Sequence, residues 1–100
     1  LNPATGWLQN ANDPPWTSTM PTALDPDGFP PYFSDRGMAF RPQRAAHMLL
    51  ADESISFEEL VAIKHDTQLE LAERLLDDLL AAATSHGDER ALAAGRVLQA

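Results

Sequence analysis

The chain has 100 residues, a net charge of −8, a pI near 4.5 and no cysteine. This acidity disfavours nucleic acids and anionic membrane surfaces as partners, because clustered Lys and Arg bind such ligands. The lack of cysteine excludes disulfides and thiolate chemistry, and no apolar run approaches the roughly 20 residues of a membrane span.

Two parts of opposite character follow one another along the chain. All eight prolines lie at or before Pro42 and six of the seven aromatic residues at or before Phe40, whereas eleven of the fifteen acidic residues come later. The sequence therefore predicts an α+β chain. Residues 1–39 form a short strand, Gly6 to Gln9, and a long proline- and aromatic-rich loop, and residues 40–100 form a helical segment of about four helices.

The segment from Asn2 to Trp16 is unsuited to a helix or a long strand. Asn and Asp side chains compete with the backbone for hydrogen bonds, and proline lacks a backbone donor. Such a segment can instead end a strand and hold amide side chains at fixed positions in a loop. Rigidly held amides are the donors that an oxyanion hole uses.

Helical signals dominate after residue 40. Ser56 and Glu59 have the spacing of a capping box, and Gly87 and Asp88 mark the end of one helix and the start of the next. The predicted helices cover residues 40–51, a short stretch from 56 or 57, a long one from Asp66 or Thr67 to Ser85, and a last one through Val97 and Leu98.

A stripe of apolar residues runs along the long predicted helix. Its steps of three and four favour packing in a globular body over a coiled coil. We expect the stripe to be partly exposed unless another chain covers it, and such exposure favours self-association. Its members are Leu69, Ala72, Leu75, Leu76, Leu79, Leu80 and Ala83.

Metal-binding patterns are weak. The three histidines, His47, His65 and His86, share neither metal-ligand spacing nor a common helix face. Asp25 and Asp27 precede a glycine as in a calcium loop, but the remaining EF-hand ligands are missing, and a plain turn is the simpler interpretation. No cofactor is predicted from these residues.

The amino-acid sequence of several segments resembles the penicillin acylase family of N-terminal-nucleophile amidohydrolases. The most specific match is Gly6-Trp7-Leu8-Gln9-Asn10-Ala11-Asn12 with the following Asp13-Pro14-Pro15-Trp16. The similarity resumes at Arg41 and continues through Ser56-Phe57-Glu58-Glu59-Leu60, Lys64-His65-Asp66-Thr67 and the helix from Leu75 to Ala83. Within that family, these segments are most similar in sequence to the branch that removes acyl chains from homoserine lactones and aculeacin-type lipopeptides.

The resemblance implies a role for two residues. Asn12 matches the asparagine whose side chain donates to the oxyanion hole, and Arg41, or alternatively Arg44, matches an arginine that supports the reaction centre. The family's nucleophile, an N-terminal serine whose α-amine acts as the base, has no counterpart here. We therefore expect a C-terminal portion of the large subunit, with a four-layer αββα fold, that is inactive alone.

The same resemblance implies partners and a location. The partners are the rest of the large subunit, the small subunit and an N-acyl amide substrate, in a periplasmic or secreted enzyme linked to antibiotics or quorum sensing. The family fold can hold calcium, although no residue here is assigned to it. The alternative is a non-catalytic α-helical interaction module with an extended N-terminal arm.

Overall fold

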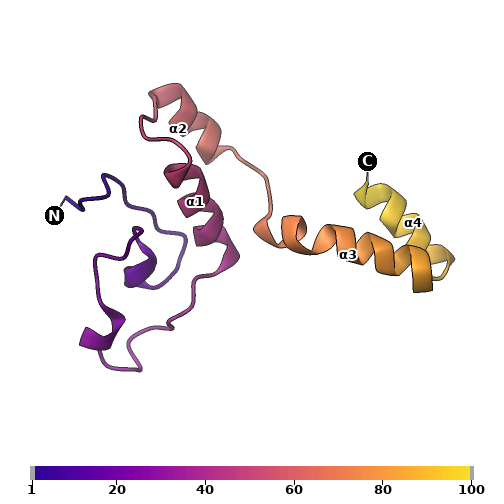
Figure 1. The fold of residues 1–100 in the computed structure, drawn as a ribbon, viewed down its shortest axis with the longest axis horizontal. Helices are drawn as coiled ribbons and strands as arrows, with labels where there is room; N and C mark the ends of the chain where they lie inside the picture. Colours follow the sequence, from indigo (N-terminus) through magenta and orange to yellow (C-terminus); the bar gives the residue numbers. More distant parts are fainter. Residues whose placement is uncertain (1, 100) are drawn as a thin grey trace. The chain divides into compact units, whose positions relative to one another are not determined.

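The computed structural model describes residues 2–99 and folds them into helices and loops (Figure 1). The α-helices are α1 (Phe40–Leu50), α2 (Phe57–Lys64), α3 (Glu70–His86) and α4 (Glu89–Leu98), and two short 3-10 helices are η1 (Pro15–Thr17) and η2 (Pro26–Gly28). The chain divides into two compact units, Leu1–Leu69 and Glu70–Ala100.

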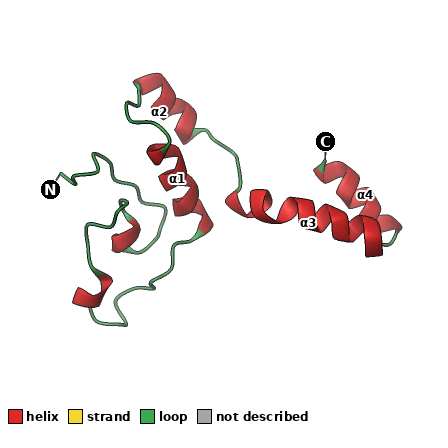
Figure 2. Cartoon of the chain, viewed as in Figure 1, coloured by secondary structure: helices red, strands yellow, loops and turns green. Residues whose placement is uncertain are grey.

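The predicted α+β class, with its αββα layers, is wrong for the chain that the structure describes. Residues 2–99 contain no strand, and Figure 2 shows only helices and loops. Gly6 has a φ of 78° and donates its N–H to the carbonyl of Pro3 at 3.0 Å, so a turn occupies the predicted start of the strand. Gln9 donates its backbone N–H to the carbonyl of Ser18 at 2.8 Å. An extended segment becomes a strand only where a second one pairs with it, and none does here.

Local signals account for the helices of the first unit. The predicted capping box is formed, because the Ser56 hydroxyl accepts from the Glu59 N–H at 3.2 Å and a Glu59 carboxylate oxygen accepts from the Ser56 N–H at 2.7 Å. Hydrogen bonds from Ser56 lower the pKa of the Glu59 carboxyl. In α1, Pro42 stands in the first turn, where a missing N–H leaves no helical bond unmade.

Buried residues in the first unit come from the N-terminal loop and from one face of α1. Pro42 and Ala46, one helical turn apart, are the buried residues of α1. Trp16, Thr17 and Thr19 are buried in the loop, and the hydroxyls of Thr5 and Thr19 are hydrogen-bonded to each other. The loop is thus an ordered, partly buried part of this unit.

The second unit is a hairpin of α3 and α4. Asp88 caps α4 by accepting the Ala91 N–H at 2.9 Å, as predicted. A β-carbon on Gly87 would lie 2.3 Å from the carbonyl oxygen of Ala83 and 2.8 Å from the β-carbon of Ala91, so the turn accepts only glycine. At Gly95, a β-carbon would lie 3.6 Å from Leu80 Cδ2, which is an ordinary contact distance, so α4 packs beside Leu80 there without requiring glycine.

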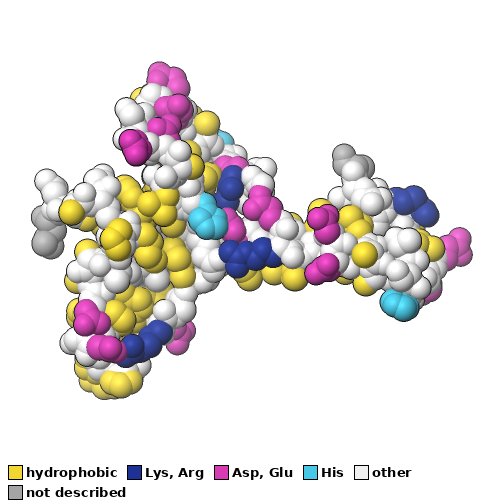
Figure 3. Space-filling model, viewed as in Figure 1, with side chains coloured by type: hydrophobic (Ala, Val, Ile, Leu, Met, Phe, Trp, Pro, Cys, Tyr) yellow, Lys and Arg dark blue, Asp and Glu magenta, His cyan; other side chains and the backbone are white. Residues whose placement is uncertain are grey.

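The predicted apolar stripe on α3 is partly exposed, as expected. Leu75 and Leu79 retain 52% and 54% of their accessible surface, whereas Leu76, Leu80 and Ala83 are half-buried. Figure 3 shows hydrophobic side chains at the surface of both units. The hairpin therefore covers one side of the stripe only.

Candidate functional site

The segment from Gln9 to Thr17 forms a loop that is held by its own side chains. The Asp13 carboxylate accepts three hydrogen bonds, from Gln9 Nε2 at 2.8 Å, from the Ala11 N–H at 2.7 Å and from the Thr17 hydroxyl. Gln9 Nε2 also donates to the carbonyl of Thr17 at 2.7 Å. The two ends of the loop are therefore joined in two ways: by the backbone hydrogen bond from Gln9 to Ser18 and by the Asp13 carboxylate, which accepts from both Gln9 and Thr17.

These contacts favour the ionised form of the Asp13 carboxyl. Burial acts to raise the pKa of the Asp13 carboxyl, but the hydrogen bonds from Thr17, from the Ala11 N–H and from Gln9 outweigh it. The resulting pKa lies below its ordinary value of 3.8. Pro14 adds stiffness, because a residue before proline is restricted to extended backbone.

Asn12 lies at the tip of this loop in the left-handed region, with a φ of 62°. Asparagine tolerates that region better than most residues. The Asn12 N–H donates to Asn10 Oδ1 at 3.0 Å, which closes a small side-chain turn. The Asn12 side chain is exposed, so its amide can meet a group that approaches the loop.

Arg41, the second residue of α1, reaches Asn12. Its Nη2 donates to Asn12 Oδ1 at 3.3 Å, across 29 positions in the sequence. Because the arginine occupies the amide oxygen, the amide nitrogen Nδ2 faces away from it. Within residues 2–99, Asn12 Nδ2 donates no hydrogen bond. The structure thus brings together both residues that the sequence singled out.

Arg44, the alternative to Arg41, is directed elsewhere. Its guanidinium binds both carboxylate oxygens of Asp66, at 2.7 and 3.1 Å, and the side-chain oxygen of Gln68 at 2.8 Å. This bidentate contact lowers the pKa of the Asp66 carboxyl, mainly through the hydrogen bond. It also ties α1 to the segment between α2 and α3. Arg44 therefore has a structural partner, whereas Arg41 has Asn12.

An aromatic cluster follows the loop. Trp16 is 6% exposed, and its ring centre lies 6.1 Å from that of Phe29 and 6.3 Å from that of Phe33. Phe29 and Phe33 stack on each other at 5.3 Å. Such contacts anchor η1, which begins at Pro15, and thereby fix one end of the Asn12 loop.

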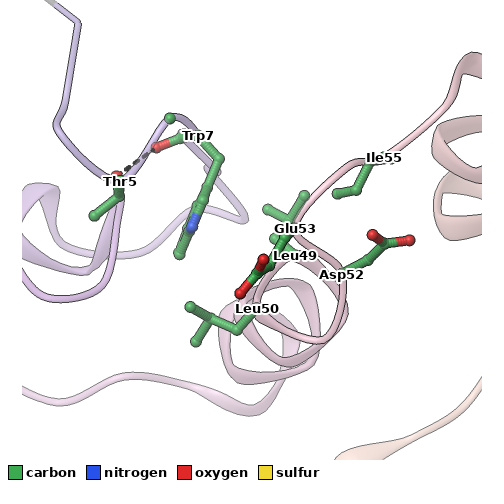
Figure 4. A pocket seen from close by; sticks show the side chains of 8 residues that line it. Thr5, Trp7, Leu49, Leu50, Asp52, Glu53 and Ile55 are labelled. Atoms are coloured by element: carbon green, nitrogen blue, oxygen red, sulfur yellow. Dashed lines mark hydrogen bonds between the residues drawn. The ribbon is translucent and has the colours of Figure 1, made fainter.

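A cavity of about 480 Å³ lies elsewhere in the first unit, between the N-terminal segment and the end of α1. Figure 4 shows Trp7, Leu49 and Leu50 around it, and the side chains of Asp52 and Glu53 also line it. Asn12 and Arg41 do not line this cavity.

Neither a metal cluster nor a membrane span is found in the described part of the chain. Within residues 2–99, no three His, Cys, Asp or Glu side chains are close enough together to hold a metal ion. Asp25 and Asp27 form the plain turn, in which Asp25 accepts the Asp27 N–H and Asp27 pairs with Arg36. None of the helices described is both long and apolar enough to cross a membrane.

A comparison with known families shows which family the chain belongs to. The family model described as penicillin amidase matches residues 1–100. The chain belongs to the penicillin amidase family. The resemblance drawn from the Asn12 segment is thereby confirmed, and the chain is part of a hydrolase of the N-terminal-nucleophile type, a multi-chain acylase.

Sequence reasoning missed Asp13 and its partners. The sequence indicated a loop at Asp13-Pro14-Pro15, but it did not identify the Asp13 carboxylate as an acceptor for the rest of that loop. A signal was present, because Asp13 lies four residues after Gln9 and four before Thr17, and both side chains can donate. Only the structure shows that all three meet.

Proposed function

We propose that this chain supplies the oxyanion donor of an acylase that hydrolyses N-acyl amides. Asn12 Nδ2 donates to the carbonyl oxygen of the scissile amide as that oxygen becomes negative. Arg41 holds the amide oxygen of Asn12 and so fixes which end of the amide faces the substrate. The observation that carries this proposal is the contact at 3.3 Å between Arg41 Nη2 and Asn12 Oδ1, which leaves Nδ2 without an acceptor among residues 2–99.

The reaction proceeds through an acyl-enzyme. A serine at the N-terminus of the large subunit attacks the carbonyl carbon, and its own α-amine takes the hydroxyl proton. The tetrahedral oxyanion collapses, the amine leaves with a proton, and water then hydrolyses the ester to release the acid. Asn12 acts in both tetrahedral steps, because a fixed dipole aimed at the developing charge needs no reorganisation during the reaction.

Several finer features belong to the proposal. The serine lies outside these 100 residues, in another part of the large subunit, so this chain alone does not turn over. The sequence of the Asn12 segment is more similar to acylases that act on homoserine lactones or lipopeptides than to those that act on benzylpenicillin. The substrates therefore carry acyl chains on homoserine lactones or lipopeptides. The setting is the periplasm or the exterior of the cell, with the small subunit as partner.

Two isosteric substitutions in the same loop provide the test. Asn12→Asp replaces the amide donor with an acceptor, whereas Asn10→Asp keeps the oxygen that accepts the Asn12 N–H. Both variants add one negative charge and delete one amide NH2 group, but only Asn12→Asp deletes the proposed oxyanion donor. Asn12→Ala removes that donor without adding a charge. Loss of one oxyanion donor lowers kcat by on the order of 10²–10³, or about 3–4 kcal/mol, with little change in KM.

The measurement is steady-state amine release by the purified, fully processed parent enzyme. Processing is checked on a gel before kcat is read, because the precursor cleaves itself with the same groups. We expect Asn12→Asp and Asn12→Ala to lose activity in that range and Asn10→Asp to stay within about threefold of the wild type. A processed Asn12→Ala enzyme with kcat within threefold of wild type contradicts the proposal, and Asn12 is then a turn residue only.

A further inference from the structure

The backbone of Asn12 is enclosed by a hydrogen-bonded ring that Asp13 closes. Asp13 Oδ1 accepts the N–H of Ala11 at 2.7 Å, two residues back along the chain. The covalent path between these two groups runs through both backbone torsions of Asn12. The bond therefore restricts φ and ψ of Asn12 together, at a residue whose φ of 62° is not the default for an L-amino acid.

The second carboxylate oxygen fixes this ring in the unit. Asp13 Oδ2 accepts from Gln9 Nε2 at 2.8 Å and from the hydroxyl of Thr17, and these two residues begin and end the loop. Gln9 is bound in turn to the carbonyls of Thr17 and Ser18. One carboxylate thus joins the tip of the loop to its base, with both oxygens in use.

We propose that Asp13 is a positioning residue for the reaction, which holds the Asn12 amide in the direction needed for oxyanion stabilisation. This inference rests on the proposed function of Asn12. Asp13 itself touches no reacting atom. Its negative charge near the loop opposes an oxyanion, so a benefit to the rate comes from geometry and not from charge.

Charge and geometry make opposite predictions for Asp13→Asn. Removing the negative charge favours an oxyanion and would raise the rate. Replacing two acceptor oxygens by one breaks either the bond to Ala11 or the bonds to Gln9 and Thr17, and so loosens the Asn12 backbone. A misplacement of a catalytic group by about 1 Å can lower the rate about 10²-fold. We expect kcat to fall roughly 10- to 100-fold, with KM within twofold.

A double-mutant cycle on the intact parent enzyme tests whether Asp13 acts through Asn12. The set is Asp13→Asn, Asn12→Ala and the double variant, all processed to the same extent. If Asp13 only positions Asn12, adding Asp13→Asn to the Asn12→Ala enzyme lowers kcat by less than about twofold, because groups that act as a unit are not additive. An equal loss in both backgrounds overturns the inference, since Asp13 then acts on something else.

Two further variants complete the experiment. Thr17→Val keeps the charge and nearly the volume. It removes one of the three bonds to Asp13, together with the contact of the same hydroxyl with the Pro14 carbonyl. It replaces Asp13→Asn in the cycle if that precursor stays unprocessed. Its expected loss in kcat is about three- to tenfold, which also disappears in the Asn12→Ala background. Asp25→Asn makes the same change in a turn outside the loop and should leave kcat within twofold.

Failure of the inference is separable from failure of the proposed function. If Asn12→Ala lowers kcat and neither Asp13→Asn nor Thr17→Val does, the oxyanion assignment stands and the positioning role is wrong. If Asn12→Ala leaves kcat unchanged, the proposed function fails first, and the positioning role falls with it.

Discussion

Removal of the Arg41 guanidinium should slow the parent acylase by much less than removal of the Asn12 amide. Arg41→Met keeps most of the side-chain volume and deletes the donor that contacts Asn12 Oδ1 at 3.3 Å. Asn12 Nδ2 can still donate after the change, but the amide is free to rotate. The loss therefore measures orientation and not the donor itself.

The distance sets the magnitude. A hydrogen bond from a charged donor contributes about 1.5–3 kcal/mol at good geometry, and 3.3 Å lies beyond the usual range of 2.7–3.2 Å. We therefore take about 1–1.4 kcal/mol for this contact. With 1.36 kcal/mol for each tenfold change in rate, kcat should fall roughly five- to tenfold.

The assay is amine release at saturating substrate by the processed enzyme. Arg36→Met is the matched control, because Arg36 is an exposed arginine that pairs with Asp27 away from the loop. A loss above about 100-fold for Arg41→Met equals the cost of a whole oxyanion donor, and would show that the arginine acts on the reacting atoms. A loss below twofold would show that it does not orient Asn12. Either result refutes the reasoning.

Three structural predictions concern the helices. Gly87→Ala should loosen the α3–α4 turn, because its β-carbon would lie 2.3 Å from a backbone oxygen. The free energy of unfolding should fall by about 1–3 kcal/mol, and thermal unfolding followed by circular dichroism should show a lower melting temperature. Ser56→Ala removes the capping-box hydroxyl and should cost about 1 kcal/mol in urea denaturation, while Ser56→Asp, which keeps a capping oxygen, should cost less. For Asp66, whose folded pKa is lowered by Arg44, the stabilisation is complete above the unfolded pKa of 3.8 and is lost as the pH falls through the folded pKa. A carboxyl titration followed by NMR should therefore give a midpoint below 3.8, which rises in Arg44→Met; an unchanged midpoint would contradict the ion pair.

Local sequence signals predicted the four helices and the starts of three of them. The capping box at Ser56 and the cap at Asp88 each involve residues three positions apart, so the sequence contains everything that forms them. The long helix begins at Glu70 and not at Asp66 or Thr67 as predicted. Asp66 is bound by Arg44, 22 positions away, and no local pattern announces that contact.

The predicted strand failed for the same reason. Gly6 to Gln9 has the composition of a short strand, but strand formation depends on a partner that the local sequence does not specify. In this chain the backbone of Gln9 bonds to Ser18, and the positive φ of Gly6 belongs to a turn. Proline and asparagine content correctly indicated a loop after residue 9, because those residues act on their own backbone.

The candidate site shows the same division between local and distant information. Sequence similarity to the family singled out Asn12 and Arg41. Their spacing alone gave no reason to expect a contact between residues 29 positions apart. Asp13 was missed, since its role depends on which groups a single carboxylate can reach. Its three donors come from both sides of Asn12.

The composition that prevents this loop from becoming a helix or strand also makes it suitable for holding a donor. Short polar side chains such as Asn10 and Asp13 bond to nearby N–H groups and close rings that a regular element would not allow. Pro14 and Trp16 then limit how the loop can move as a whole. The conformational entropy of Asn12 is therefore lost when the protein folds and not when substrate binds. An amide that is fixed in advance needs no reorganisation during the reaction, and this allows it to stabilise a transition state more than a ground state.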